Sequence, residues 1–340
     1  MIQPWALAQS LMIALVTRLS GLRAVTEHCP HLLHTDNYSS LSPAMERRSF
    51  VAFVRQMVAS LESKHQPGED ELVALDGMAL TLPKTQRHRC AKFNNKTVGG
   101  GVIWAYLIQA TKGVCPVRIL KVVRGAWNDA TAMNGVALIP DGPVYLMDRG
   151  FHGYALFRQW LTDRVRFIVR LKRRILRYEV LKTVGAPRRC GNKWISRDAV
   201  ARLGIATAKI RPVVRLVIAT LPSGEELILA SDRFDWSAER ILAAYKKRWH
   251  IERFHRFLKD TLGLAHLYNF DQDGIEFLLY TALLSALLLF ACEEHPAGDT
   301  ITILRRILRT LRRQLGLGVL WKRNTFTPRH SRAGSTKEKG

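Results

Sequence analysis

The chain is 340 residues long and 47% hydrophobic, which gives enough apolar material for one large domain or two ordinary ones and excludes an intrinsically disordered chain. Lysine and arginine number 52 against 28 aspartates and glutamates, so the formal net charge is +24. A positive charge of this size indicates the kind of partner that the protein binds, not its fold. It favours a polyanion over a basic surface with no special partner.

The five cysteines are scattered, odd in number and without a Cys-x-x-Cys pair, which indicates a reducing compartment and no disulfide framework. A zinc site at His28, Cys29, His31 and His34 is not favoured, because no second ligand pair follows at zinc-finger spacing. The N-terminus lacks the basic region of a signal peptide. The most apolar run, Phe277–Cys292, is shorter than the roughly 20 residues that span a bilayer. We therefore expect a cytoplasmic protein with a buried helix at this run.

The first part of the chain predicts helices. Apolar residues recur at helical spacing over 5–26 and 45–63, which indicates two or three helices. The turn at 65–70 contains Gln66-Pro67-Gly68 and is the expected domain boundary. The N-terminal unit, residues 1–66, is expected to recognise a DNA end or to pack against the main body.

From residue 72 the pattern changes to strands. Two apolar runs, 72–75 and 144–147, are each followed by an acid with a glycine close behind it, Asp76-Gly77 and Asp148-Arg149-Gly150. Asn128 is expected to cap a short helix between them. Further strands are predicted at 102–110, 117–123 and 166–171, with a turn at Lys112-Gly113 and a helix at 154–162. This order predicts an α/β domain with a mixed sheet.

The sequence from residue 172 onward gives fewer clear signals of secondary structure. Residues 172–225 hold basic clusters, and strands are expected at 213–220 and 227–230. Ser237 is expected to cap the next helix. A helix at 301–315 alternates apolar residues with arginines, and the tail from residue 323 is basic and polar.

One stretch, residues 245–259, concentrates polar side chains along one side of a predicted helix. At about 100° per residue, with Tyr245 as zero, Arg248 falls at about −60°, Glu252 at about −20° and Lys259 at about −40°. The opposite side is apolar and is expected to face the core; it carries Ile251, Phe254, Phe257 and Leu258. A carboxylate among cationic donors suits a metal ion that holds a phosphate.

Two further acids fit this chemistry. Asp76 and Asp148 are expected at the carboxyl ends of strands, where ligands bind in open α/β sheets, and a helix carrying Glu252 could close over that edge. Three carboxylates without a Cys or His cluster suit Mg²⁺ or Mn²⁺, and two such ions suit phosphodiester chemistry. Each acid also has a structural interpretation, as a turn former for the two aspartates or as an ion-pair partner for Glu252.

These residues carry a resemblance. The spacing of Tyr245, Arg248, Glu252 and Lys259 resembles the Tyr-(2)-Arg-(3)-Glu-(6)-Lys signature of bacterial insertion-sequence transposases with a DDE catalytic domain, in particular insertion sequence family four. Members also show Asp-Gly after the first strand and Asp-Arg-Gly-Phe/Tyr after a later one, as at residues 76–77 and 148–151. The resemblance covers roughly residues 70–290. Met78 stands where many members have Ser or Thr.

The resemblance implies an α/β, RNase H-like catalytic domain of the retroviral integrase superfamily over residues 67–294, with a β-rich insertion at about 172–230. A basic C-terminal helix and tail would follow at 295–340. It implies Asp76, Asp148 and Glu252 as the ligands of Mg²⁺ or Mn²⁺, with two ions expected.

The same resemblance implies that Tyr245, Arg248 and Lys259 grip the phosphate at the transposon end. Relatives that cut through a hairpin intermediate stack a flipped base on an aromatic residue of the insertion. Trp194 is the only tryptophan within residues 175–230, and a buried structural role is the favoured interpretation of it.

The sequence therefore predicts a DNA transposase that cuts at the ends of its element and joins them to target DNA. Double-stranded DNA is the expected partner, a homodimer on DNA the expected assembly, and no membrane is expected. The rival hypotheses are an RNase H-like nuclease without strand transfer, a non-catalytic DNA-binding protein, and a membrane-surface protein that uses the basic helix at 301–315.

Overall fold

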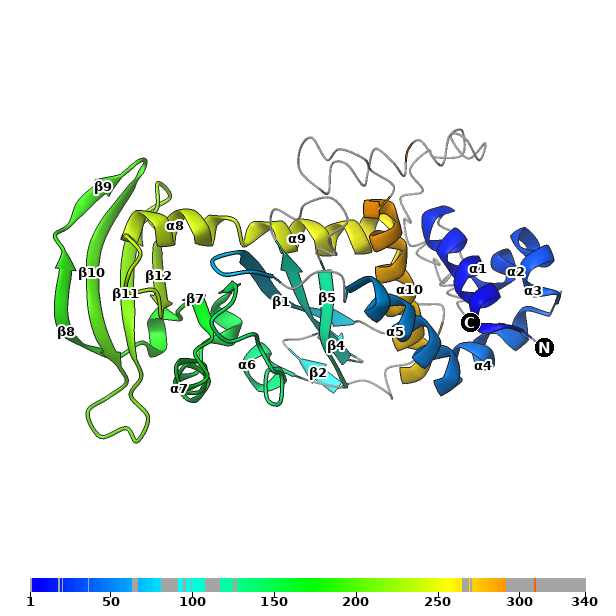
Figure 1. Cartoon of the computed structure of the whole chain (residues 1–340), viewed down its shortest axis with the longest axis horizontal. Helices are drawn as coiled ribbons and strands as arrows, with labels where there is room; N and C mark the ends of the chain where they lie inside the picture. The colour runs from blue at the N-terminus through cyan, green and yellow to red at the C-terminus, as the bar shows by residue number, and fades with distance from the viewer. Residues whose placement is uncertain are drawn as a thin grey trace, which may run out of the picture.

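A computed structural model describes residues 2–17, 19, 21–35, 37–62, 67–80, 91–93, 96–98, 100–107, 117–124, 127–264, 269, 271–291 and 309 (Figure 1). The turn at 112–113 and all but Arg309 of the predicted helix at 301–315 lie outside these residues.

Among the described residues, ten strands form one mixed sheet. This sheet includes strands before residue 171 as well as the strands from residue 178 onward. Its order is β5-β4-β1-β6-β7-β12-β11-β10-β8, with β9 paired to β10. The strands are β1 (Leu72–Leu80), β4 (Gly100–Leu107), β5 (Val117–Arg124), β6 (Val144–Met147), β7 (Arg166–Arg170), β8 (Tyr178–Gly185), β9 (Arg188–Cys190), β10 (Lys193–Leu203), β11 (Val213–Thr220) and β12 (Glu226–Ser231). A separate pair is formed by β2 (Ala91–Phe93) and β3 (Lys96–Val98).

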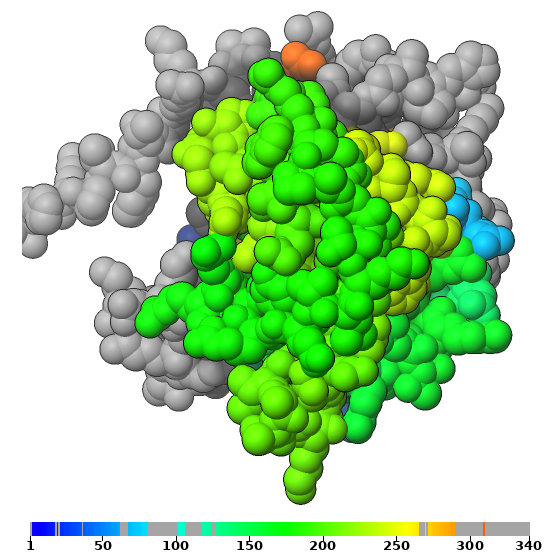
Figure 2. Space-filling view, turned by 90° about the vertical axis from the view of Figure 1, so that its left-hand side faces the viewer, coloured from blue at the N-terminus to red at the C-terminus, as the bar shows by residue number. Residues whose placement is uncertain are grey.

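The direction of the strands divides the sheet. β1, β6 and β7 are parallel, whereas β4 and β5 form an antiparallel pair on one side. β12 pairs antiparallel with β7 and leads into the antiparallel strands β11, β10 and β8. The predicted mixed sheet is confirmed, as are the strands at 213–220 and 227–230. In Figure 2 the strands β8 and β10 form one end face of the molecule.

Helices cover both faces of the central strands. α6 (Asp129–Ala132), the 3₁₀ turn η3 (Arg149–Phe151) and α7 (Tyr154–Thr162) cover one face. The elements from residue 238 on cover the other face. They are α8 (Ala238–Lys246), α9 (Trp249–Arg256), the π-helical segment η5 (Phe257–Thr261) and α10 (Gln272–Ala291). The N-terminal helices lie beyond them, with α1 (Pro4–Thr17), α4 (Leu41–Met45) and α5 (Arg48–Glu62) packed against α10. The other N-terminal elements are α2 (Leu22–His28), α3 (Pro30–Leu33) and η1 (Tyr38–Ser40).

Alternation along the strands builds the two cores. Ala74 of β1 and Leu146 of β6 face the core that contains α9, whereas Leu75 and Met147 face the core that contains α7. Side chains of a strand point alternately to opposite faces, so Asp76 lies on the same face as Ala74, toward α9. In Figure 1, α8 and α9 run along this side from the strands β8–β12 to α10.

The apolar helix α10 packs against α1, α4 and α5. It is long and apolar enough to cross a membrane by length and composition alone, but most of its surface is buried inside the protein. The predicted buried helix is confirmed as far as the described residues extend, because α10 ends at Ala291 and residue 292 lies outside them. The caps expected of Asn128 and Ser237 are confirmed too, because their side chains accept hydrogen bonds from the backbone N–H groups of Thr131 (2.8 Å) and Arg240 (3.2 Å).

Candidate active site

The parallel pairing of β1 and β6 brings two predicted acids together. Leu75 pairs with Met147, so Asp76 and Asp148 occupy the next position along each chain at the same edge of the sheet. The Asp76 side chain is 19% exposed. Burial raises the pKa of this carboxyl to about 7, and the nearby charge of Asp148 acts in the same direction. The carboxyls of Asp76 and Asp148 therefore interact electrostatically.

Asp76 does not end its strand, contrary to the prediction. β1 continues to Leu80 through antiparallel pairing with β4, in which Asp76 lies opposite Trp104. What ends after Leu75 is the parallel pairing with β6. The backbone of Asp76 is therefore paired with β4 on one side and unpaired on the side of β6. Asp148 does follow its strand directly, as predicted.

The glycines of the two motifs, Gly77 and Gly150, provide space for another side chain rather than a left-handed turn. Neither Gly77 nor Gly150 has a positive φ. Both instead make room for the side chain of Asp129. A Cβ atom on Gly150 would lie 1.9 Å from Asp129 Oδ2, and a Cβ atom on Gly77 would lie 2.3 Å from Asp129 Oδ1. The two motifs thus form a cradle for a third aspartate.

Trp127 holds the start of α6, and with it Asp129, in position beside this cradle. Its indole lies over Gly77 and Gly101, where added Cβ atoms would come within 2.3 Å and 2.0 Å of the ring. Asn128 then caps α6, and Asp129 is the first residue of that helix. Glycines on β1 and β4 therefore hold the Trp127 ring, and with it the start of α6, against the sheet.

The sequence interpretation missed Asp129 as a site residue. Burial raises the pKa of its carboxyl to about 6, and the charge of Asp148 contributes in the same direction while Lys172 opposes it. The charge of Asp129 in turn raises the pKa of Asp76. The only signal in the sequence was an acid beside an N-cap, which is an ordinary feature of helix starts.

Helix α9 supplies the positive charge that faces these acids. Nη1 of Arg248, the N-cap residue of α9, lies 3.9 Å from Oδ2 of Asp76. Nδ1 of His255 lies 3.7 Å from the same oxygen. Burial lowers the pKa of His255 to about 3, so this imidazole is neutral. It packs against Trp104, the β4 partner of Asp76, with ring centroids 6.3 Å apart.

Glu252 is held by Arg248, one helical turn earlier, through a short hydrogen-bonded ion pair. Its side chain is 30% exposed. Through Arg248 it is connected to Asp76, so the structure brings Glu252 to the site but directs its carboxylate to the guanidinium. The other side of α9 and η5 is buried as predicted, with Ile251, Phe254, Phe257 and Leu258 fully covered.

The predicted helix is not continuous. α8 ends at Lys246, α9 begins at Trp249, and residues 257–261 are π-helical. The regular spacing of about 100° per residue therefore fails at both ends of the stretch, although Tyr245, Arg248 and Glu252 still meet. Lys259 lies in η5 and is exposed; its charge lowers the pKa of His255, which places it within electrostatic reach of the site. π-helical turns frequently occur at functional sites.

Tyr245 faces the same group of charges from the end of α8. Its ring is buried, and its hydroxyl has no hydrogen-bond partner among the residues that the structure describes. Burial raises the pKa of the phenol, with Asp148, Arg170 and Arg248 close enough to affect it. The Arg248 guanidinium lies 5.9 Å from the centre of the ring. A phosphate oxygen would satisfy this buried donor.

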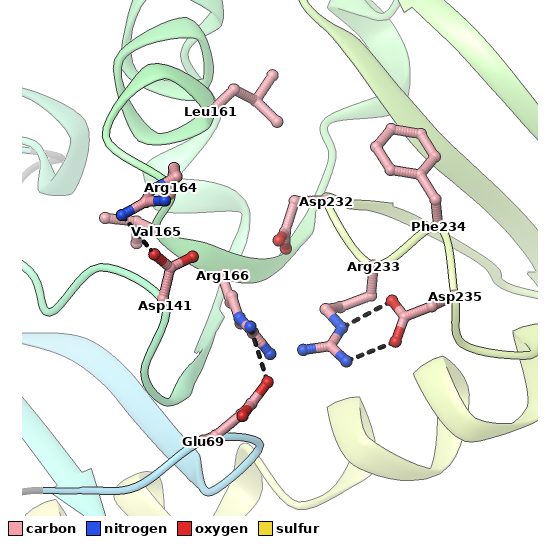
Figure 3. A pocket seen from close by; sticks show the side chains of 10 residues that line it. All are labelled: Glu69, Asp141, Leu161, Arg164, Val165, Arg166, Asp232, Arg233, Phe234 and Asp235. Atoms are coloured by element: carbon pink, nitrogen blue, oxygen red, sulfur yellow. Dashed lines mark hydrogen bonds and ion pairs between the residues drawn. The ribbon is translucent and has the colours of Figure 1, made fainter.

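A different pocket lies at the opposite end of β6 and β7 (Figure 3). It has a volume of about 410 Å³ and is lined by charged side chains. These charges are paired: Arg164 with Asp141 (2.8 Å), Arg166 with Glu69 (2.9 Å) and Arg233 with Asp235 (2.6 Å). Asp232 accepts a hydrogen bond from the backbone N–H of Phe167 (2.6 Å). A pocket whose charges satisfy one another is a structural feature of this edge.

A comparison with protein families identifies the family of the chain. A model of the transposase DDE domain matches residues 67–288, more than half of the chain. The chain belongs to the DDE transposase family. Residues 76, 148 and 252 all lie within the matched region.

Several relatives carry the same description. The "Putative transposase y4zB" of Sinorhizobium fredii is 24% identical over 64% of this chain and 62% of its own length. The "Putative transposase for insertion sequence element IS4SA" of Synechocystis is 30% identical over 44% of this chain and 41% of its own. The "Probable transposase for insertion sequence element IS5377" of Geobacillus stearothermophilus is 23% identical over 43% and 38%. The matches span less than two thirds of each of these relatives, and they agree with the resemblance to insertion sequence family four.

For a DDE transposase, the donor set of this site suits a hard cation. Asp76, Asp129 and Asp148 crowd negative charge that burial disfavours, and oxygen ligands are those that Mg²⁺ and Mn²⁺ prefer. Within the described residues, no three Asp, Glu, His or Cys side chains are close enough together to form a ready metal cluster. Glu252, one of the expected ligands, instead forms an ion pair with Arg248.

The chain also exposes Trp194, for which a buried role was predicted. Half of this side chain is accessible. The register between β10 and β11 shifts between Ile195 and Arg197, two residues after Trp194. Such bulges re-aim side chains. Trp194 lines a cavity of about 340 Å³ together with Arg189 and Lys193.

Proposed function

We propose that this chain is a DNA transposase that cuts at the ends of its own element and joins the freed ends to target DNA. The carrying observation is the placement of Asp76 and Asp148 side by side at one sheet edge, with Arg248 of α9 3.9 Å from Asp76 and bound to Glu252. These residues come from β1, β6 and the start of α9, and Asp76 and Arg248 are 248 − 76 = 172 residues apart in the sequence.

We propose an RNase H-like domain for this chemistry, and three properties of the central strands support it. β1, β6 and β7 are parallel, β4 and β5 complete the sheet in antiparallel fashion, and the acids lie at the ends of the β1–β6 pairing. The strands β8–β12 fall within the expected insertion, before the helices that carry Glu252. The division into residues 1–66, 67–294 and 295–340 is part of the same proposal, as is a cytoplasmic location.

Asp76, Asp148 and Glu252 would hold Mg²⁺ or Mn²⁺, with Asp129 as a neighbouring fourth carboxylate. When bound, a pair of such ions supplies Lewis-acid activation of an attacking oxygen and stabilisation of a leaving oxygen. Arg248 would have to release Glu252 for it to serve as a ligand, and the guanidinium would then be available to a phosphate. Guanidinium groups bind phosphate through charge-assisted hydrogen bonds.

Tyr245, Arg248 and Lys259, which lie around these acids, would bind the phosphate of the DNA end. The Tyr245 hydroxyl is a buried donor without a partner among the described residues, and Lys259 and Arg248 carry charge on either side of Glu252 along the helix. The net charge of +24 supports double-stranded DNA as the partner. A homodimer that bridges two DNA ends is proposed from the family resemblance.

Cleavage of DNA that carries the element ends tests the proposal. We expect Mg²⁺-dependent strand cleavage by the parent protein and a loss of at least about 10³-fold in Asp148→Asn and Glu252→Gln. Asp163→Asn, at an exposed helix end, is the control and should cleave normally. Normal cleavage by either site variant would contradict the assignment. Pre-cut ends then separate a transposase, which joins them to target DNA, from a nuclease, which does not.

A further inference from the structure

A second cationic surface lies beside Asp148, on elements outside the predicted signature. β7 runs parallel to β6, with Met147 paired to Val169, so the residues after β7 reach the same edge of the sheet as Asp148. These residues include the 3₁₀ turn η4 (Arg173–Ile175). Together with Arg149 and the turn between β11 and β12, they enclose a pocket of about 780 Å³. This basic pocket is nearly twice the size of the pocket in Figure 3.

The basic pocket differs from the pocket of Figure 3 in its charge. Arg170 and Arg173 form ion pairs with Glu225 and Glu226. The remaining three cations, Arg149, Lys172 and Arg174, are exposed and make no ion pair with any described residue. The rim therefore has an excess of three positive charges. Clustered cations that form no ion pair with the described residues favour an anionic ligand.

The pocket is fixed in position relative to the acids. The backbone N–H of Lys172 donates a hydrogen bond to Nδ1 of His152 (3.0 Å), the residue that follows η3. The His152 ring stacks on Phe157 of α7, with centroids 5.9 Å apart and planes at 12°. This contact joins the loop after β7 to the turn that begins at Asp148. A cationic rim held rigidly beside an acid is suited to positioning a ligand.

The sheet order places the acids between two cationic surfaces. α9 packs against β1 and β4, whereas the basic pocket lies at the end of β7, and the order of the strands is β4-β1-β6-β7. β1 and β7 are two strand spacings apart, or about 10 Å. Phosphates follow one another about every 3.4 Å along the axis of each strand of duplex DNA. A strand with its scissile phosphate at Asp76 and Asp148 would thus have phosphates two to three nucleotides away at the pocket.

We propose that the basic pocket binds the phosphodiester backbone of DNA next to the scissile phosphate, through Arg149, Lys172 and Arg174. This inference rests on the proposed function for the position of the scissile phosphate, whereas the binding of DNA by the pocket stands on its charge alone. The exposed Ile175 at the rim, 56% accessible, offers an apolar surface to a sugar. The pocket and the signature on α8 to η5 would then hold the strand on both sides of the cut.

Salt-dependent binding tests the pocket without any cleavage. The triple variant Arg149→Gln/Lys172→Gln/Arg174→Gln is compared with Arg158→Gln/Lys182→Gln/Lys209→Gln, which removes three exposed cations elsewhere that are likewise without ion pairs to described residues. Anisotropy of a labelled DNA duplex of random sequence is followed over a range of salt concentrations. We expect the slope of log K against log salt to fall by about 2 to 3 in the pocket variant and affinity to fall at least about tenfold. Equal slopes and affinities in the two triple variants would overturn the proposal.

Neutral phosphates locate the contact. DNA carrying one methylphosphonate two or three nucleotides from the cut is compared with unmodified DNA for cleavage by the parent and the pocket variant. If the pocket binds that phosphate, the methylphosphonate lowers cleavage by the parent but lowers cleavage by the pocket variant little further. The reason is that the neutral phosphate and the triple substitution remove the same contact. Additive losses at every position near the cut would overturn the placement. Arg149→Lys/Arg174→Lys, which keeps the charge, should recover most of the affinity and shows that folding is intact.

The two proposals fail in different ways. If the parent protein binds DNA with a salt slope that depends on the pocket but never cleaves element ends, the proposed function fails and the pocket stands as a DNA-binding site. If the parent cleaves and the pocket variant cleaves and binds as the control does, the proposed function stands and the pocket has no role in DNA binding.

Discussion

Oδ2 of Asp76 lies 3.9 Å from Arg248 and faces the neutral ring of His255, while Oδ1 accepts the backbone N–H of Gly77 at 2.9 Å. A single cation thus opposes the effect of burial on this carboxyl, and burial is the larger effect because the pKa is raised to about 7. The metal-free site therefore stores unfavourable electrostatic energy that a bound cation would relieve.

This raised pKa predicts the pH dependence of stability. The folded protein binds the Asp76 proton more tightly than the unfolded chain, so the contribution of Asp76 becomes less favourable as pH rises from about 4 to about 7 and is constant above that. Asp76→Asn removes this cost. We expect the metal-free variant to be about 1–4 kcal/mol more stable than the parent at pH 8, at about 1.4 kcal/mol per pKa unit, and no more stable at pH 4. Denaturant unfolding at both values measures this.

Added Mg²⁺ should reduce the stability advantage of Asp76→Asn over the parent. Mg²⁺ at pH 8 is expected to stabilise the parent more than Asp76→Asn, because the asparagine is a weaker ligand for a hard cation. Equal responses of the parent and the variant to Mg²⁺ would contradict a role for Asp76 in metal binding.

Arg248 is predicted to control the protonation of Asp76. Its positive charge lowers the pKa of that carboxyl, so Arg248→Gln should raise the Asp76 pKa further and shift the pH profile of cleavage to higher pH. The same change frees Glu252 from its ion pair and removes a proposed phosphate donor, so cleavage should also fall about 10²-fold. Arg256→Gln, at the exposed end of α9, is the matched control. A pH profile identical to that of the parent would show that Arg248 does not act on Asp76.

Asp129 is predicted to support the metal site. Asp129→Asn keeps the shape of the side chain in its cradle between Gly77 and Gly150 but removes a charge. We expect the Mg²⁺ concentration for half-maximal cleavage to rise about 10- to 100-fold, the range found when residues that support metal ligands are changed. A Mg²⁺ titration of cleavage measures this, with Asp163→Asn as control.

The cradle itself gives an independent test. Gly150→Ala should cost about 1–3 kcal/mol of stability, because its Cβ would meet the Asp129 carboxylate at 1.9 Å. Asp129→Ala in the same chain should recover part of that loss. Strictly additive costs would show that Gly150 and Asp129 do not share the space.

The sequence alone located the acids and the helix, because both depend on local patterns. The run before Asp148 and the spacing of Tyr245, Arg248 and Glu252 reflect strand and helix periodicity, and the structure brings these residues together. Asp129 was missed because its contacts come from glycines of distant strands. The break after Lys246 and the π-helical turn at Lys259 were not predicted, because the alternation of polar and apolar residues over 245–259 fits one continuous helix.

Trp194 shows the same limit and leads to the last prediction. A tryptophan in a strand was expected to be buried, but half of Trp194 is exposed beside Arg189 and Lys193. An exposed ring flanked by cations is suited to stacking an unpaired base. We predict that Trp194→Ala weakens binding of a DNA end with an unpaired terminal base by about 1–3 kcal/mol, whereas Trp194→Phe keeps most of the affinity. 2-Aminopurine at the terminal position reports stacking directly, since its fluorescence is quenched by a stacked ring. Fluorescence that is the same with the parent and with Trp194→Ala would exclude this contact, and Trp249→Ala, an equally exposed tryptophan at the start of α9, controls for general loss of an aromatic surface.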